Sequence, residues 1–247
     1  RARALLRQDD PEGAGAALAP ALDRFAGRRD LREYAIAVSA LRYDWEATHT
    51  LLDEYDRLSP GSARGYYEAG RALADSRQYA QAAKWLGEAF HRAPAWAAPA
   101  AELGLLEVQS GRDQEALIAL ERAEQLDPYN VRVGNSLKLM REIQTYERTE
   151  TSHFVIRSRA GIDTLLAREM VPVLEEMYAI VCGDRPGGLD HSPAGKTVIE
   201  LMPDHAWFAV RIAGLPRIHT IAASTGPVIA MEVPREGRGH KGAYDWQ

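Results

Sequence analysis

One stretch of 34 residues occurs twice in this chain, first in residues 63–96 and again in residues 97–130. Five positions carry the same residue type in both copies: Gly70 and Gly104, Ala82 and Ala116, Leu86 and Leu120, Ala89 and Ala123, and Pro94 and Pro128. A fixed period of 34 residues is typical of a solenoid built from helix-turn-helix units. The repetition therefore predicts that this part of the chain is entirely helical.

The small and apolar residues of each copy have the spacing of two helices. Gly70 is a small residue on the apolar face of the first helix, so a neighbouring helix can approach closely there. Ala82, Leu86 and Ala89 mark one face of the second helix, at spacings of four and three residues. Pro94 closes the unit because proline cannot continue a helix interior. These positions resemble the tetratricopeptide repeat, whose small, apolar and terminal proline positions fall at the same offsets.

Upstream of the two clear copies the period continues in weakened form. Leu52 and Pro60 keep the spacing, whereas Ile36 and Thr48 stand where the clear copies have glycine and alanine. We therefore expect degenerate repeats over residues 1–62. Stacked repeats need neighbours to bury their faces, and three to four units are enough for that.

After Pro128 the pattern changes. One more apolar-periodic segment predicts a capping helix over residues 129–147, which completes a repeat region of residues 1–147. Residues 148–152 are polar and lack an apolar period, so we expect a linker there.

From His153 onward strand-like and helix-like periods alternate, which predicts a second, smaller domain of the α+β class over residues 153–247. Its expected elements are a strand at 153–157, a helix at 162–181, a strand at 197–202, a short helix capped by Asp204 and reaching Ile212, and strands at 218–223 and 228–233.

Composition excludes some partners. A net charge of −5 gives the chain no general attraction to nucleic acid or to an anionic membrane. No run of 18 apolar residues exists to span a bilayer. The single cysteine, Cys182, excludes an intramolecular disulfide but leaves the compartment open, either cytoplasmic or bacterial exported. We expect both Arg1 and Gln247 to lie inside a longer protein.

Five short segments of the second domain stand out: Thr151–Ile156, Val198–Pro203, Trp207–Arg211, Gly214–Pro216 and Gly226–Ile229. In this order they resemble the N-terminal part of the peptidase MA-like, or gluzincin, domain, which in bacterial proteins often follows tetratricopeptide repeats. The resemblance covers roughly residues 151 to 247 and implies a zinc-dependent peptidase in the parent protein.

The chemistry of that family needs His-Glu-x-x-His on a helix, because two imidazoles one turn apart hold zinc and the glutamate activates its water. None of the seven histidines here begins that motif. The resemblance would place the metal helix shortly after Tyr244–Gln247. We therefore assign no catalytic or metal-binding residue and no cofactor to this chain, and expect zinc only in a longer protein.

Other residues that suggest chemistry have simpler interpretations. His205, His219 and His240 fit no compact metal-ligand spacing. Asp204 beside His205 suggests an acid-base pair, but an aspartate in this position more often caps a helix. Cys182 ends an apolar helix and is best interpreted as a small buried hydrophobic residue.

A structural peptide site is also conceivable in the second domain. Thermolysin-like domains hold an extended peptide against an edge strand, and one of the strands within 218–233 is a candidate for that edge. Ala230-Met231-Glu232 resembles the substrate-binding strand of zinc aminopeptidases, in which the glutamate holds the substrate amine. Ile229 and Val233 depart from that pattern.

For the repeats, the family pattern places a partner-binding groove on the first helix of each unit. The predicted groove residues are Arg64, Tyr67, Arg71, Asp75, Leu105 and Gln109, with Ala98, Ala101 and Val108 beside them. The lysine and asparagine set that clamps a C-terminal carboxylate in chaperone-binding repeats is absent. Such a mixed groove suits a peptide or a partner helix, although these residues could instead pack against the following domain.

Two classes of function follow. In the first, the repeats are a protein-protein interaction module that positions a protein or peptide partner for a zinc-metallopeptidase-like domain. In the second, the chain is a non-catalytic scaffold or adaptor whose α+β domain is a structural or binding module.

Overall fold

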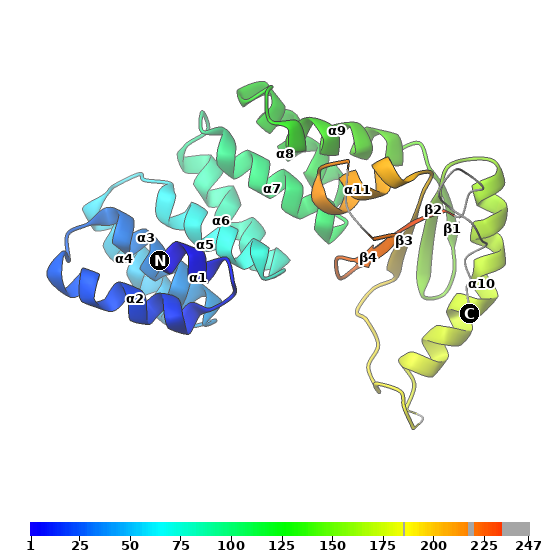
Figure 1. Ribbon diagram of the computed structural model, residues 1–247, viewed down its shortest axis with the longest axis horizontal. Coiled ribbons are helices and arrows are strands. Elements are labelled where there is room, and N and C mark those ends of the chain that lie inside the picture. The colour runs from blue at the N-terminus through cyan, green and yellow to red at the C-terminus, as the bar shows by residue number, and fades with distance from the viewer. Residues whose placement is uncertain (185, 217–219, 234–247) are drawn as a thin grey trace. The chain divides into compact units, whose positions relative to one another are not determined.

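Eleven helices and five strands make up the part of the chain that the structure, a computed structural model, describes (Figure 1). The described residues are 1–184, 186–216 and 220–233. They fall into two units. Arg1–Glu107 and Gln114–Asn130 form a helical unit, whereas Val108–Asp113 and the chain from Val131 onward form an α+β unit. The expected fold class, a helical solenoid followed by a smaller α+β domain, is confirmed.

The helices of the repeat region follow one another in pairs, as the 34-residue period predicts. They are α1 Ala2–Leu6, α2 Pro11–Arg24, α3 Arg29–Leu41, α4 Trp45–Leu58, α5 Arg64–Asp75, α6 Tyr79–Arg92, α7 Ala97–Ser110 and α8 Asp113–Leu126. Helices α5 and α6 form the first clear copy of the 34-residue repeat, and α7 and α8 form the second. Helix α5 packs extensively against both α6 and α3.

Two glycines allow the helices of each clear pair to approach closely. A Cβ atom on Gly70 would lie 2.9 Å from the backbone nitrogen of Leu86 in α6. A Cβ atom on Gly104 would lie 3.0 Å from the backbone nitrogen of Leu120 in α8. Because real Cβ atoms do not approach backbone so closely, only glycine fits at these two positions without a shift of the helices.

The α3–α4 pair reaches the same packing with larger residues. Ile36 and Thr48, which replace the small residues of the clear repeats, are fully buried. The Thr48 hydroxyl lies 2.6 Å from the Asp44 carbonyl and 3.0 Å from the Ser39 hydroxyl, so the buried polar group has partners. The side chain of Asp44 accepts from the backbone N–H of Ala47 and caps α4.

The α+β unit contains a five-stranded mixed sheet. Its elements are α9 Val131–Ile143, β1 Glu147–Glu150, β2 Phe154–Ser158, α10 Ile162–Val181, β3 Thr197–Met202, α11 His205–Ala213, β4 Ala222–Ser224 and β5 Val228–Glu232. The strand order is β1-β2-β3-β5-β4, with parallel pairing at β2/β3 and β3/β5 and antiparallel pairing at both ends.

The two faces of this sheet have different chemistry. On one face, Ile156 and Leu201 pack with Met170 of α10 in an apolar cluster. On the other face, the residues that alternate with them include Arg157 and Glu200, which are both buried. A buried chain of charges runs across this second face: Arg211 pairs with Glu200, Glu200 with Arg157, and Arg157 with Asp113 at 2.6 Å.

Most elements expected after residue 152 occur within a residue or two of their expected bounds, but three expectations differ from the structure. Of the strand expected at 218–223, the described residues Thr220 and Ile221 are not in a strand, and β4 begins at Ala222. Residues 148–152 were expected as a linker, whereas Glu147–Glu150 form strand β1. The strand is stabilised by pairing with β2, which its polar sequence does not reveal. The capping helix expected at 129–147 is α9, Val131–Ile143, and it belongs to the α+β unit.

Some expectations concern residues outside the described part. The beginning of the strand expected at 218–223 lies there, as do His219, His240 and Tyr244–Gln247. In the described part, no helix is both long and apolar enough to cross a lipid bilayer.

Candidate partner-binding site on the helical repeats

The predicted groove residues fall in both units. Arg64, Tyr67, Arg71 and Asp75 follow one another along α5, and Leu105 lies on α7; all five belong to the helical unit. Gln109 lies on the last turn of α7 and belongs to the α+β unit. There its backbone carbonyl accepts a hydrogen bond from the Thr225 hydroxyl at 2.7 Å. A site within the helical unit therefore rests on the other five residues.

Two of these residues meet at an aromatic side chain that the sequence analysis did not single out. Trp96 lies in the turn between α6 and α7, and its ring centroid is 4.6 Å from that of Tyr67. The guanidinium carbon of Arg64 lies 5.3 Å from the Trp96 ring centroid. Arg64 is exposed and both rings are partly exposed, so the three side chains present a mixed aromatic and cationic surface. A tryptophan two residues after the repeat-ending Pro94 is the sequence signal that could have identified it.

Arg71 has a different environment from Arg64. It is buried and pairs with Glu68, one turn earlier on α5, at 2.8 Å. Its Nε atom is buried without a hydrogen-bond partner. The Glu68 carboxylate raises the pKa of Arg71 although burial acts in the opposite direction. The charge of the buried Arg71 is therefore already balanced by Glu68. Asp75, at the end of α5, is exposed.

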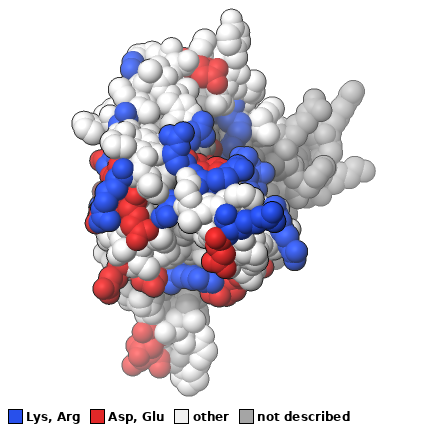
Figure 2. Space-filling view, turned by 90° about the vertical axis from the view of Figure 1, so that its left-hand side faces the viewer, with Lys and Arg blue, Asp and Glu red and all other residues white. Residues whose placement is uncertain are grey.

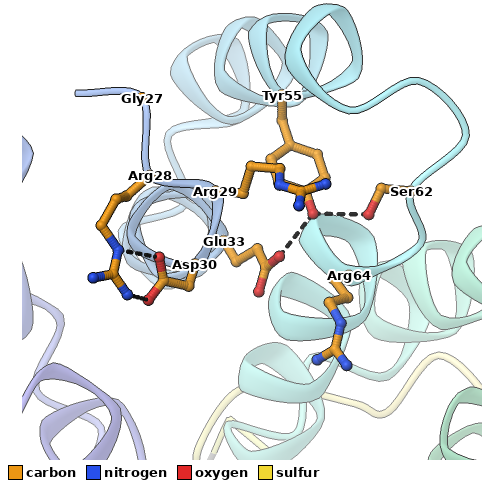
Figure 3. Close-up of a pocket in the computed structure, with 8 residues that line it drawn as sticks. All are labelled: Gly27, Arg28, Arg29, Asp30, Glu33, Tyr55, Ser62 and Arg64. Atoms are coloured by element: carbon orange, nitrogen blue, oxygen red, sulfur yellow. Dashed lines mark hydrogen bonds and ion pairs between the residues drawn. The ribbon is translucent and has the colours of Figure 1, made fainter. Parts of the chain in front are cut away.

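Next to Arg64, the ends of α3, α4 and α5 enclose a hollow of about 540 Å³ (Figure 3). At its centre the Tyr55 hydroxyl donates to the Glu33 carboxylate at 2.8 Å and lies 2.9 Å from the Ser62 hydroxyl. Figure 3 shows the Arg29 side chain next to Tyr55 and the Arg64 side chain below this network. The hollow therefore has a fixed polar centre and two cationic walls.

The electrostatics of the hollow follow from burial. Burial raises the pKa of Glu33, against the lowering effect of its hydrogen bond from Tyr55 and of the Arg64 charge. Burial also raises the pKa of Tyr55 to about 12, so that its hydroxyl stays protonated and donates at neutral pH. The Glu33 carboxylate accepts its hydrogen bond from the neutral Tyr55 hydroxyl and forms no direct ion pair with Arg29 or Arg64.

The arginines of the hollow differ in how they are paired. Arg28 forms two hydrogen bonds with Asp30, at 2.9 and 2.6 Å, on the far side of α3 (Figure 3). Arg29 has only a long contact of 3.5 Å with the Ser59 hydroxyl. Within the described residues, no carboxylate lies at ion-pair distance from Arg29 or Arg64. These two side chains have hydrogen-bond donors available for a ligand.

The 34-residue period relates the hollow to the predicted groove. Asp30 and Glu33 precede Arg64 and Tyr67 by one period. Ala98 and Ala101 follow them by one period, on α7. The face formed by the first helices therefore changes from acidic to cationic and aromatic and then to small apolar residues. We did not assign the first pair from sequence because the upstream repeat is degenerate.

The candidates for chemistry in the α+β unit have structural partners. The Asp204 side chain accepts from the backbone N–H of Trp207 at 2.9 Å and so caps α11. His205 Nδ1 lies 3.0 Å from Glu232, which occupies the last position of β5. Cys182 is partly buried at the end of α10. In the described part of the chain, no three histidine, cysteine, aspartate or glutamate side chains converge as a metal site would require.

Comparisons with known proteins give a likeness only at the level of structure. No family model matches the sequence, and no curated protein matches it. A crystal structure of MamA aligns with a TM-score of 0.41 at 20% identity, over 57% of this chain and 82% of that one. The MamA RS-1 ArsTM double mutant aligns with a TM-score of 0.41 at 21% identity, over 72% of this chain and 91% of that one. MamA 41-end from Desulfovibrio magneticus RS-1 aligns with a TM-score of 0.41 at 20% identity, over 72% of this chain and 92% of that one. Likeness at this level says nothing about a partner or an activity.

Proposed function

We propose that the helical unit is a protein-protein interaction module that binds a segment of a partner across the surface formed by Arg64, Tyr67 and Trp96. The observation that supports this most strongly is the contact of the three side chains, 4.6 Å between the rings and 5.3 Å from the guanidinium to Trp96. Tyrosine, tryptophan and arginine dominate the binding energy of protein interfaces, because each combines a large contact area with a polar end.

The surroundings of this surface support a peptide-sized partner. On one side the hollow at Glu33 and Tyr55 offers about 540 Å³ with donors and acceptors already in place. One repeat further on, α7 carries the small apolar residues Ala98 and Ala101 at the positions of Arg64 and Tyr67. A rigid groove with one polar and one apolar end binds an extended segment in one direction, since the reversed segment leaves polar groups unpaired.

A peptide selection experiment tests the proposed docking. Peptides selected from a displayed library against the protein should lose about tenfold or more in affinity for Trp96→Ala, measured by calorimetry. Tyr129→Ala is the matched control, since Tyr129 is 90% exposed in the turn after α8, and it should leave the affinity unchanged. Selected peptides that bind Trp96→Ala as tightly as the native protein would show that the interaction surface lies elsewhere.

For the α+β unit, the resemblance to the peptidase MA-like domain suggests a second role, as part of a zinc-metallopeptidase-like domain that receives the partner. The placement of β4 favours this role. Among the described strands it lies at the end of the sheet, next to β5, and its residues Ala222 and Ala223 carry no charge that would block pairing with an extended peptide. The opposite edge, β1, carries Glu147, Arg148 and Glu150.

Zinc content and peptide hydrolysis of the full-length parent protein separate this role from that of a non-catalytic scaffold or adaptor. A His-Glu-x-x-His helix encoded after Gln247, stoichiometric zinc and hydrolysis of a peptide would support the peptidase. Without that motif and without zinc, the scaffold role would stand, and docking on the helical unit would be unaffected.

A further inference from the structure

A second group of arginines lies close to the proposed docking surface. Helix α1 places Arg1, Arg3 and Arg7 around a hollow of about 530 Å³, together with Ala4 and Gln8. All three arginines are exposed. In the described part of the chain, none of them has a carboxylate within ion-pair distance.

Electrostatic and ring contacts connect this group to the docking surface. Burial and Glu102 raise the pKa of the Tyr67 phenol to about 12. The positive charges of Arg71 and Arg3 act in the opposite direction. Tyr67 in turn contacts Trp96, and Trp96 contacts Arg64. The aromatic pair therefore has Arg64 of α5 in contact with it, and the charge of Arg3 of α1 acts on Tyr67.

The carboxylates near this surface are already engaged. Asp30 pairs with Arg28, and Glu68 pairs with Arg71. Glu33 accepts a hydrogen bond from the Tyr55 hydroxyl. Five exposed or partly exposed arginines remain without a carboxylate partner, and we call them the arginine strip: Arg1, Arg3, Arg7, Arg29 and Arg64. Figure 2, which views the molecule from the side of its N-terminal helices, shows Lys and Arg side chains in several groups with Asp and Glu among them.

We propose that the partner segment is acidic, with aspartate or glutamate side chains that bind the arginine strip next to an apolar or aromatic residue packed on Tyr67 and Trp96. This inference rests on the docking proposed above and names the chemistry of the partner. Arginine side chains bind carboxylates through paired N–H donors, so each unpaired guanidinium near the surface can bind one acidic side chain of the partner.

A protein segment fits this surface better than a nucleic acid. Glu33, Glu68 and Glu102 lie among the cationic and aromatic side chains, where a continuous row of phosphates would meet them. A peptide can place its carboxylates at the arginines alone and its apolar residues between them. The net charge of −5 for the whole chain also opposes non-specific binding to nucleic acid or to an anionic membrane.

The test compares three synthetic peptides of the same length, in which leucine or tryptophan alternates with glutamate, with glutamine or with lysine. The glutamate peptide should bind best, and its affinity should fall about fivefold or more as salt rises from about 50 to about 300 mM. Arg3→Gln and Arg64→Gln should each weaken it by about three- to tenfold. Arg168→Gln, an equal loss of charge at an exposed position on α10, should not.

The outcomes separate this inference from the docking itself. Equal binding of the glutamine and glutamate peptides, still lost in Trp96→Ala, would keep the docking surface and overturn its preference for acidic segments. Absence of binding by all three peptides would count against both. Tighter binding of a single-stranded oligonucleotide, lost in Arg3→Gln and Arg64→Gln, would assign the strip to nucleic acid and overturn the proposal.

Discussion

At the scale of single residues, Arg92 joins three helices of the helical unit through one guanidinium group. It binds both carboxylate oxygens of Asp56 on α4, at 2.6 and 2.9 Å. It also lies 2.9 Å from the Tyr66 hydroxyl of α5 and 2.7 Å from Glu88 of α6. The guanidinium carbon is 4.0 Å from the centroid of the Tyr66 ring. Arg92 therefore fixes the contact between consecutive repeats.

We expect Arg92→Ala to lower the free energy of unfolding by about 1 to 3 kcal/mol, because it leaves the partly buried Asp56 without its charged donors. Arg92→Lys should recover only part of this loss, since an ammonium group cannot form the paired contact. Urea denaturation measures both variants. Arg122→Ala serves as the exposed control, and equal effects of the variants at Arg92 and Arg122 would contradict the assignment.

A second residue-scale prediction concerns pH. Glu175 of α10 accepts from the backbone N–H of His153 at 3.0 Å and lies 2.6 Å from its Nδ1 atom. Hydrogen bonds from Thr151 and His153 lower the pKa of Glu175 from 4.5 to about 2. Because the folded pKa lies below the unfolded value, the stabilisation is present above about pH 4.5 and is lost as the pH falls towards 2.

Glu175→Gln should therefore lower the melting temperature at neutral pH, and the difference from the native protein should shrink between about pH 4.5 and 2. Thermal unfolding followed by circular dichroism across this range measures the difference. Glu176→Gln, at the exposed neighbouring position, is the matched control. A difference for Glu175→Gln that stays constant down to pH 2 would show that the ionised carboxylate has no such role.

At the scale of helices, replacing two glycines of the repeats by alanine should change the stability of the protein in opposite directions. Gly70→Ala should destabilise the protein by about 1 to 3 kcal/mol, although alanine is the better helix former, because its Cβ would lie 2.9 Å from the backbone of α6. Gly87→Ala is the control within α6, where nothing lies within 4 Å of the added atom. It should stabilise the protein by up to about 1 kcal/mol. The same sign for both substitutions would contradict the close approach of α5 and α6.

The elements that could be predicted from sequence are those whose period is local. Helices α5 to α8, α10 and strand β3 follow from spacing alone, as does the capping role of Asp204. Strand β1 could not be predicted, because its sequence is polar and only pairing with β2 stabilises it. Trp96 was missed as a part of the candidate site because it lies in a turn, and turns carry no period. Its contact with Tyr67 depends on the packing of consecutive helices.

At the scale of the whole molecule, the repeat sequence and the contact units do not end at the same place. Val108–Asp113 belongs to the last clear repeat by sequence and to the α+β unit by its contacts. Asp113 pairs with the buried Arg157 at 2.6 Å, and Val228 lies against Gly111. The buried charges on the second face of the sheet therefore depend on this short segment. Sequence could not show this, because Asp113 and Arg157 are far apart in the chain.

Asp113→Asn should destabilise the α+β unit by about 2 to 4 kcal/mol, because it removes the closer of the two carboxylates that pair with the buried Arg157. Glu115→Gln, also a loss of one negative charge in the first turn of α8 but at an exposed position, should change stability by less than about 0.5 kcal/mol. Urea denaturation compares the two. A smaller effect at Asp113 than at Glu115 would contradict a structural role for the pair.

For the protein as a whole, the site of binding can be located by nuclear magnetic resonance with the glutamate-containing peptide. The largest shifts should occur at the indole N–H of Trp96 and at the backbone amides of α5, while the amides of β4 and of Tyr129 stay in place. Shifts confined to β4, or none at Trp96 when the peptide is bound, would contradict the assignment of docking to the helical repeats.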